Sequence, residues 1–209
     1  MAEIKNICVY CGSSPGNDPV YLEGAQTFGR SLAHAKIGLV YGGGGIGLMG
    51  AVAHACLDAG GRVTGIIPDF LVEREQALKF DEKGFKVDHT VIVTKDMHVR
   101  KRTMFEQADA FVAMPGGIGT LEELVEQMTW LQLGQHKKPL LLLNLKNFWA
   151  PLLALLEHQQ AQGFIRRGSF RFLLAEQPDQ IVPMLRDAAR SLSEAELHGP
   201  GAKLVAEEM

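Results

Sequence analysis

Residues 38–50 read Gly-Leu-Val-Tyr-Gly-Gly-Gly-Gly-Ile-Gly-Leu-Met-Gly, an apolar run that leads into a glycine-rich turn. The run is typical of a buried parallel strand, and the residues from about 47 onward predict a helix. Glycine tolerates positive φ and lets the backbone approach a ligand closely. The turn, residues 42–50, is called the first glycine loop; it predicts free amides at a helix N-terminus, which bind phosphate without a lysine. The alternative is a turn needed only for tight strand–helix packing.

Strand and helix patterns alternate along most of the chain. Apolar runs that predict buried strands lie at residues 7–10, 38–41, 63–67, 90–93, 110–114 and 140–143. Helical patterns cover approximately residues 18–36, 47–59, 97–108, 119–133 and 148–162. This alternation predicts an α/β fold, a Rossmann-like doubly wound parallel sheet with helices on both faces.

Length and composition favour one domain. The chain has 209 residues, of which 46% are hydrophobic and 22% charged, so it resembles an ordinary globular protein. We expect the domain to span residues 1–189 and residues 190–209, which have few large apolar side chains, to form a mobile tail.

Charge and cysteine content narrow the function classes. The net charge of −3 provides no basic field for nucleic acid, so any bound anion must be held by a local site. Three cysteines cannot form a disulfide framework, and the sequence has neither a signal-peptide pattern nor an apolar run long enough to span a membrane. We therefore expect a cytoplasmic protein without membrane or nucleic-acid partners.

A second glycine loop, residues 115–120, follows the predicted strand at 110–114. Residues 114–123 read Met-Pro-Gly-Gly-Ile-Gly-Thr-Leu-Glu-Glu and repeat the Gly-Gly-Ile-Gly of residues 44–47. Because ligands bind at the carboxyl ends of the strands in a doubly wound sheet, both loops are expected to converge on one molecule. Glu122 and Glu123 begin the following helix, where acids also stabilise the helix dipole by roughly 0.3–1 kcal/mol each.

Three cations crowd the start of another predicted helix. Residues 96–102 read Asp-Met-His-Val-Arg-Lys-Arg, and the helix dipole disfavours cations at that end. An anionic substrate would favour them, with Arg100 suited to a bidentate contact. The alternative is a solvated charge run, and His98 is expected to be structural.

Two other kinds of site are weakly indicated. Cys8 and Cys11 lie three apart on a strand, so they point to opposite faces, and we expect no metal site. Neither glycine loop is followed by Gly-Lys-Ser/Thr, which argues against a P-loop NTPase. The first loop fits Gly-x-Gly-x-x-Gly, so a dinucleotide oxidoreductase with Asp69 at the ribose is an alternative, although it leaves the second loop unexplained.

Four motifs together resemble one family. They are Cys-Gly-Ser-Ser-Pro at 11–15, Gly-Leu-Met-Gly at 47–50, Met-His-x-Arg-Lys at 97–101 and Pro-Gly-Gly-x-Gly-Thr-x-Glu-Glu at 115–123. Over residues 4–185 the chain resembles the Lonely guy (LOG) family of cytokinin riboside 5′-monophosphate phosphoribohydrolases. The resemblance implies hydrolysis of the N-glycosidic bond of a nucleoside 5′-monophosphate, without a cofactor, to give the free base and ribose 5-phosphate.

The resemblance also implies roles for particular residues. Arg100 and Glu123 match the catalytic pair, and Glu122 matches a residue that lines the site. Helix geometry adds that adjacent residues project about 100° apart, so Glu122 is expected to point away from Glu123, either to the pocket rim or to Arg100. The 5′-phosphate is expected on the amides of the second glycine loop. The implied substrate-binding residues are Ser13, Gly44, Gly45, Gly47, Glu82, Lys101, Gly117, Ile118, Gly119, Thr120, Leu121, Glu122 and Thr129.

The substrates expected are N6-substituted adenine nucleotides and AMP itself. A phosphorylated-cofactor carrier of the molybdenum-cofactor type, which is similar in fold, is the alternative function. Apolar residues in 128–133 and 148–156 are compatible with the homodimer that the resemblance implies.

Overall fold

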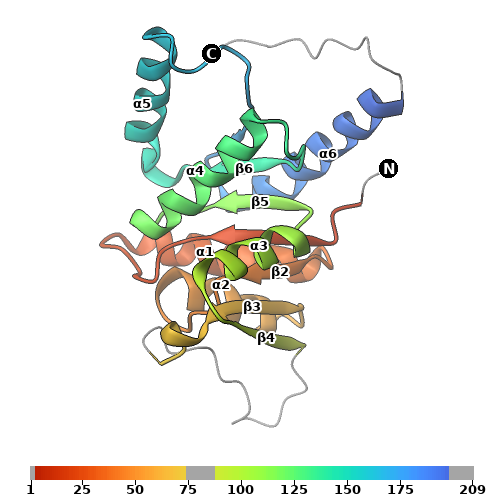
Figure 1. The fold of residues 1–209 in the computed structure, drawn as a ribbon. Coiled ribbons are helices and arrows are strands. Elements are labelled where there is room, and N and C mark those ends of the chain that lie inside the picture. Colours follow the sequence, from red (N-terminus) through yellow and green to blue (C-terminus); the bar gives the residue numbers. More distant parts are fainter. Residues whose placement is uncertain (1–2, 74–87, 198–209) are drawn as a thin grey trace.

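The computed structural model describes residues 3–73 and 88–197, and side chains as far as residue 192. A seven-stranded parallel sheet forms its centre, in the order β4-β3-β2-β1-β5-β6-β7 (Figure 1). The strands are β1 (Asn6–Tyr10), β2 (Gly38–Tyr41), β3 (Val63–Pro68), β4 (His89–Thr94), β5 (Ala110–Ala113), β6 (Leu140–Leu143) and β7 (Leu173–Ala175). The helices are α1 (Pro19–His34), α2 (Gly47–Asp58), α3 (Met97–Gln107), α4 (Ile118–Gln132), α5 (Ala150–Ala161) and α6 (Ile181–Leu197). Short 3-10 turns occupy Asp69–Leu71, Leu145–Asn147 and Pro178–Gln180.

The strand order reverses between β1 and β5. From β1 the chain adds strands outward to β4, and it then returns to place β5 on the other side of β1, with Tyr10 opposite Ala113. At such a reversal the loops after adjacent strands diverge and leave a crevice at the carboxyl ends. The fold therefore places the loops after β1, β2 and β5 side by side.

Each face of the sheet is covered by its own helices, as the doubly wound prediction requires. Ile7, Val9 and Cys11 pack into the core cluster that contains α1, α2 and α6. Cys8 and Tyr10 pack into the other cluster, with side chains from α3 and α4. The cysteines of the Cys-x-x-Cys pair thus lie on opposite faces of the sheet.

The predicted strands and helices are confirmed to within a few residues, but two elements were not predicted. These are β7, which has only three residues, and α6. Residues 190–197 form the end of α6, whereas 198–209 lie outside the described residues, so the mobile tail stays a prediction. The prediction that residues 90–93 are buried was wrong, because β4 is an edge strand in which Thr90, Val91 and Val93 are exposed and Ile92 is half-buried. Among the described residues, no helix combines the length and apolar character needed to cross a bilayer.

Helices α1 and α2 cross closely at Gly29. A Cβ at this position would lie 2.3 Å from the carbonyl oxygen of Val52 and 3.0 Å from the amide nitrogen of Cys56. Both atoms belong to the backbone of α2, so they cannot rotate away. This crossing fixes where α2 begins, and hence where the first glycine loop lies.

Gly29→Ala should therefore lower the free energy of unfolding, by about 1–3 kcal/mol from overpacking. The sign of the change in unfolding free energy is informative, because Gly→Ala at an open helical position stabilises the fold by about 1 kcal/mol. Urea unfolding of the variant and of Ser31→Ala, a half-buried position on the same helix, would measure the difference. An increase in stability for Gly29→Ala would contradict the close crossing.

Candidate active site

Gly12, in the loop after β1, connects the two glycine loops. Its amide donates to the carbonyl of Pro115 at 3.1 Å, and its carbonyl accepts from the amides of Leu48 and Met49 at 3.0 and 3.3 Å. The loops after β1, β2 and β5 therefore form one hydrogen-bonded unit at the reversal of strand order. The sequence correctly predicts that both glycine loops lie at this edge of the sheet.

The first glycine loop is largely used for packing. Two amides in the first turn of α2 donate to Gly12, so they are already occupied. Gly47 has φ +61°, and a Cβ there would lie 2.3 Å from the carbonyl of Ser13. Thus the packing interpretation applies to the helix start, and free amides at this loop stay a prediction.

The second glycine loop is open. Gly117 is the N-cap of α4, and no side chain caps this helix. A Cβ at Gly117 or Gly119 would meet nothing within 4 Å, and Ile118 is 82% exposed. The first amides of a helix have no intrahelical partner, and they lie at the positive end of the helix dipole. The N-terminus of α4 is therefore suited to an anion.

Arg100 lies in the first turns of α3 and reaches across the ends of two strands. Its Nε donates to the carbonyl of Ile66 at 3.1 Å, and Nη2 donates to the carbonyl of Gly42 at 3.3 Å. A Cβ at Gly42 would lie 2.1 Å from Nη2. One role of the first glycine loop is thus to leave room for this guanidinium.

Arg100 forms a buried ion pair with Glu123 of α4. The distance from Nη1 to Oε1 is 3.3 Å, and the two residues are 6% and 8% exposed. The carboxylate also lies near the buried Cys11: burial raises the pKa of this thiol, and the charge of Glu123 raises it further. The structure thus brings together the two residues that the sequence singled out as a catalytic pair.

The neighbouring cations pair with other carboxylates. Lys101 Nζ contacts Glu122, and it donates to Glu126 Oε1 at 2.9 Å. Burial opposes the charge of Lys101, but these hydrogen bonds raise its pKa above the usual value. Arg102 pairs with Glu106 one turn along α3. Carboxylates of the chain therefore explain all three cations at the start of α3, and Glu122 pairs with Lys101 rather than with Arg100.

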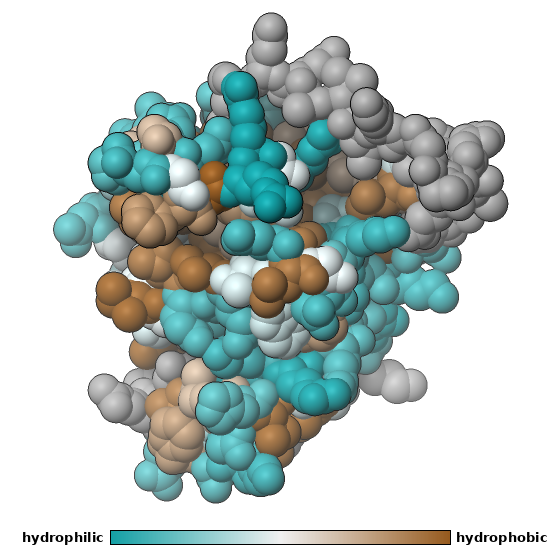
Figure 2. Space-filling view, turned by 45° about the horizontal axis from the view of Figure 1, so that its top comes forward, coloured by the Kyte–Doolittle hydropathy of each residue, from teal (hydrophilic) through white to brown (hydrophobic). Residues whose placement is uncertain are grey.

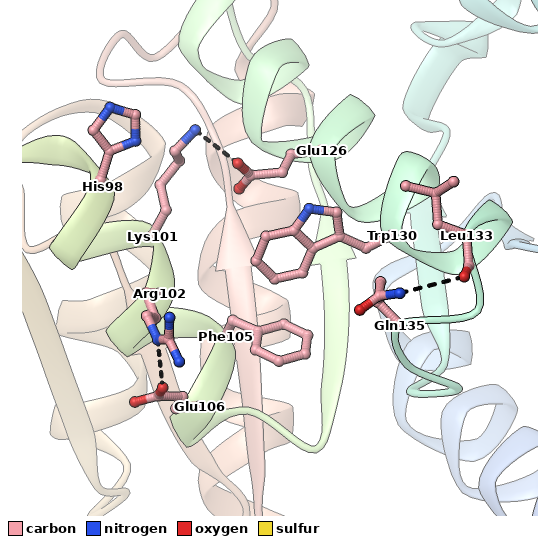
Figure 3. Close-up of a pocket in the computed structure, with 9 residues that line it drawn as sticks. All are labelled: His98, Lys101, Arg102, Phe105, Glu106, Glu126, Trp130, Leu133 and Gln135. Atoms are coloured by element: carbon pink, nitrogen blue, oxygen red, sulfur yellow. Dashed lines mark hydrogen bonds and ion pairs between the residues drawn. The ribbon is translucent and has the colours of Figure 1, made fainter.

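A groove lies between α3 and α4 (Figure 3). Phe105 and Trp130 lie against each other on its wall, edge to face at 4.8 Å between ring centroids. Lys101 and Glu126, which pair with each other, line this groove, whereas Arg100 and Glu123 are not among its lining residues. The groove has no signal in the sequence, because its residues come mainly from two helices and carry no local motif.

The remaining predicted residues lie at different distances from the pair. Thr120 is buried at the start of α4, where Gly116 gives its side chain room, and Ser13 is exposed in the loop after β1. Thr129 lies on the exposed side of α4, roughly 9 Å further along the axis than Glu123, and its hydroxyl donates to Val125. Of the other predicted residues, Gly44 is buried, whereas Gly45, Gly47 and Leu121 are half-buried. Glu82 lies outside the described residues. Within residues 3–73 and 88–197, no three His, Cys, Asp or Glu side chains are grouped closely enough to hold a metal ion.

Removal of one partner of the Arg100–Glu123 pair should destabilise the fold more than removal of both. Arg100→Met leaves a buried carboxylate without its cation, which typically costs about 3–5 kcal/mol. Arg100→Met/Glu123→Leu replaces the pair with apolar side chains and should recover a large part of that loss. Urea unfolding of the two single variants and the double variant would test this, and strictly additive losses would show that the two side chains do not interact.

Comparisons with known proteins find relatives that match most of this chain. A family model described as "Possible lysine decarboxylase" matches residues 49–185. The cytokinin riboside 5′-monophosphate phosphoribohydrolase LOG of Oryza sativa subsp. japonica is 42% identical over 92% of this chain and 74% of its own length. The enzyme of the same name from Rhodococcoides fascians is 44% identical over 77% of this chain and 78% of its own.

Solved structures resemble this one in fold. A molybdenum cofactor binding protein from Rippkaea orientalis has a TM-score of 0.63 at 21% identity, covering 90% of this chain and 99% of the other. At that identity the likeness concerns the fold alone. The sequence relatives go further, because they are above 40% identical over most of the chain. The chain therefore belongs to the LOG family.

Proposed function

We propose that this chain hydrolyses the N-glycosidic bond of cytokinin riboside 5′-monophosphates, and of AMP, to the free base and ribose 5-phosphate. The observation that carries the proposal is a buried Arg100–Glu123 pair beside the open N-terminus of α4. The names of the sequence relatives support the same reaction. Lysine decarboxylation is not supported at this site, since Lys101, the lysine beside the pair, is engaged by Glu122 and Glu126.

The 5′-phosphate would bind at the second glycine loop. The amides of Gly117, Ile118, Gly119 and Thr120 lie at the start of α4, where the helix dipole favours an anion. Open space around Gly117 and Gly119 leaves room for phosphate oxygens against the backbone. With the phosphate held there, the ribose would lie toward the second turn of α4, which carries Glu123.

Glu123 would act on the anomeric carbon. Breaking the bond from C1′ to the base nitrogen develops positive charge on the sugar, which a nearby carboxylate stabilises. The same carboxylate can accept a proton from the water whose oxygen bonds to C1′, and the departing base takes up a proton in turn. Because its Nε and Nη2 are held by carbonyls, Arg100 would orient Glu123 for this task.

The carboxylate of Glu122, which is paired with Lys101, is proposed to lie at the pocket rim. Lys101, Thr129, Leu121, Ser13 and the first glycine loop are proposed as further parts of the substrate site. Glu82 is proposed on the family resemblance alone.

A homodimer is supported by apolar exposure on α4 and α5. Leu133 at the end of α4 is 66% exposed, Leu155 of α5 is 51% exposed, and none of the α5 residues is buried. Figure 2, in which the top of Figure 1 is turned forward, shows hydrophobic side chains between hydrophilic ones on this side of the molecule. Met128, which belongs to the stretch 128–133 expected at the dimer face, is buried in the core and cannot contribute to that face. The three free, buried cysteines support a cytoplasmic location.

A direct test is to incubate the protein with AMP or isopentenyladenosine monophosphate, without metal or NAD, and to measure ribose 5-phosphate and free base. Stoichiometric release of both products would support the hydrolase. Tight nucleotide binding without release would favour a carrier of phosphorylated ligands instead.

The two adjacent acids should differ in their kinetic effects. Glu123→Gln removes the charge that stabilises the transition state, so kcat should fall by a factor on the order of 10² or more. Glu122→Gln weakens a contact to Lys101 and should change KM or stability more than kcat. Steady-state kinetics and thermal melts of both variants would decide, and the opposite pattern would assign the catalytic role to Glu122.

Nucleosides should be poor substrates, because the amides at the start of α4 have no anion to bind when the phosphate is missing. A phosphate contact of this type contributes about 1.5–3 kcal/mol per charged hydrogen bond, so kcat/KM should fall by at least about tenfold from AMP to adenosine. Equal values would mean that the second glycine loop binds something else.

A further inference from the structure

A basic hollow lies at the amino ends of the strands, opposite the carboxyl ends that carry the candidate active site. Lys5, Lys36 and Arg62 line it from positions just before β1, β2 and β3, and Arg186 and Arg190 line it from α6. The hollow has a volume of about 730 Å³, within the range of approximately 300–1,000 Å³ typical of small-molecule sites. None of these residues belongs to the catalytic machinery proposed above.

The charge of this hollow is unusual for the chain. Five of the 21 lysines and arginines line it, against one carboxylate, that of Glu3, although the whole chain has a net charge of −3. A concave surface lined by one sign of charge concentrates ions of the opposite sign. The hollow is therefore a local exception to a slightly acidic molecule.

Neutral acceptors hold two of the guanidinium groups in place. Arg62 Nη2 donates to Asn6 Oδ1 at 2.8 Å, and Arg186 Nη2 donates to the carbonyl of Ala35 at 3.1 Å. These contacts orient the side chains without cancelling their charge. Arg190, in contrast, pairs with Asp187 at 3.5 Å.

Gly38 gives Arg62 its position. A Cβ at Gly38 would lie 2.4 Å from Asn6 Oδ1 and 2.8 Å from Arg62 Nη2. The glycine thus leaves the space that the guanidinium occupies beside the start of β1. Arg186 binds a carbonyl at the end of α1, so its position can be explained by stabilisation of a helix C-terminus. Arg62 binds a side chain of β1, so this explanation does not apply to it.

We propose that the basic hollow is a second anion site, which binds a small ligand with a di- or triphosphate group. Several cations around one hollow match the charge of such a group better than that of a single phosphate. Arginine is suited to it because its planar donors bind phosphate oxygens in pairs. The ligand is either an inorganic polyphosphate or a nucleotide that carries the same group.

The test is calorimetric titration of the full chain with inorganic triphosphate and, separately, with ATP. Arg62→Gln/Arg186→Gln removes two oriented donors, so affinity should fall by at least about tenfold, while thermal melting shows that the fold is kept. The matched control is Arg102→Gln/Arg167→Gln, which removes the same charge from exposed positions outside the hollow and should leave affinity nearly unchanged. Equal affinity for the two ligands would identify the phosphates as the recognised group, and tighter binding of ATP would identify a nucleotide.

A third variant separates this site from the catalytic one. Gly117→Val fills the space at the second glycine loop and should leave binding in the hollow intact. Triphosphate binding that is lost in Gly117→Val and kept in Arg62→Gln/Arg186→Gln would overturn the proposal, as would equal losses in the two arginine double variants. Because the readout is binding rather than hydrolysis, failure here leaves the proposed reaction unaffected.

Discussion

The arrangement of this site depends on one buried guanidinium. Arg100 of α3 binds one carbonyl just after β2 and one within β3, and it also pairs with Glu123 of α4. A buried charge is tolerated only when its donors are satisfied, so these partners must keep their relative positions. The guanidinium thus couples the end of the sheet to both helices that carry the candidate catalytic groups, and it does so before any substrate arrives.

The sequence was sufficient to predict the sheet and most helices. Runs such as 38–41 and 140–143 are apolar throughout, as parallel strands covered on both faces must be, and Asp18 before Pro19 marked the start of α1. The three residues of β7 are too few to show a pattern. The exposure of β4 follows from its place at the edge, which only the assembled topology reveals.

The Arg100–Glu123 pair was predicted from the sequence, but its other contacts were not. Motif matches identified Arg100 and Glu123, and the turn of α4 placed Glu123 on the same side as Thr120. The sequence does not show that the carbonyls of Ile66 and Gly42 bind Arg100, because every residue carries the same backbone carbonyl. For the same reason, the use of Gly12 to occupy the start of α2 was not foreseen.

That occupied helix start limits what the crevice can hold. A dinucleotide presents a pyrophosphate between two nucleosides, and a Rossmann site binds it at the helix that follows the first strand. Here a long loop follows β1, and α1 begins only at Pro19. At the next helix, α2, the amides of Leu48 and Met49 are bound to the carbonyl of Gly12. Of the helix starts around this crevice, that of α4 offers its amides to a ligand. An uncapped helix start is therefore found at α4 rather than at the first helix after the first strand, which distinguishes this crevice from the pyrophosphate site of the redox enzymes with a similar sheet.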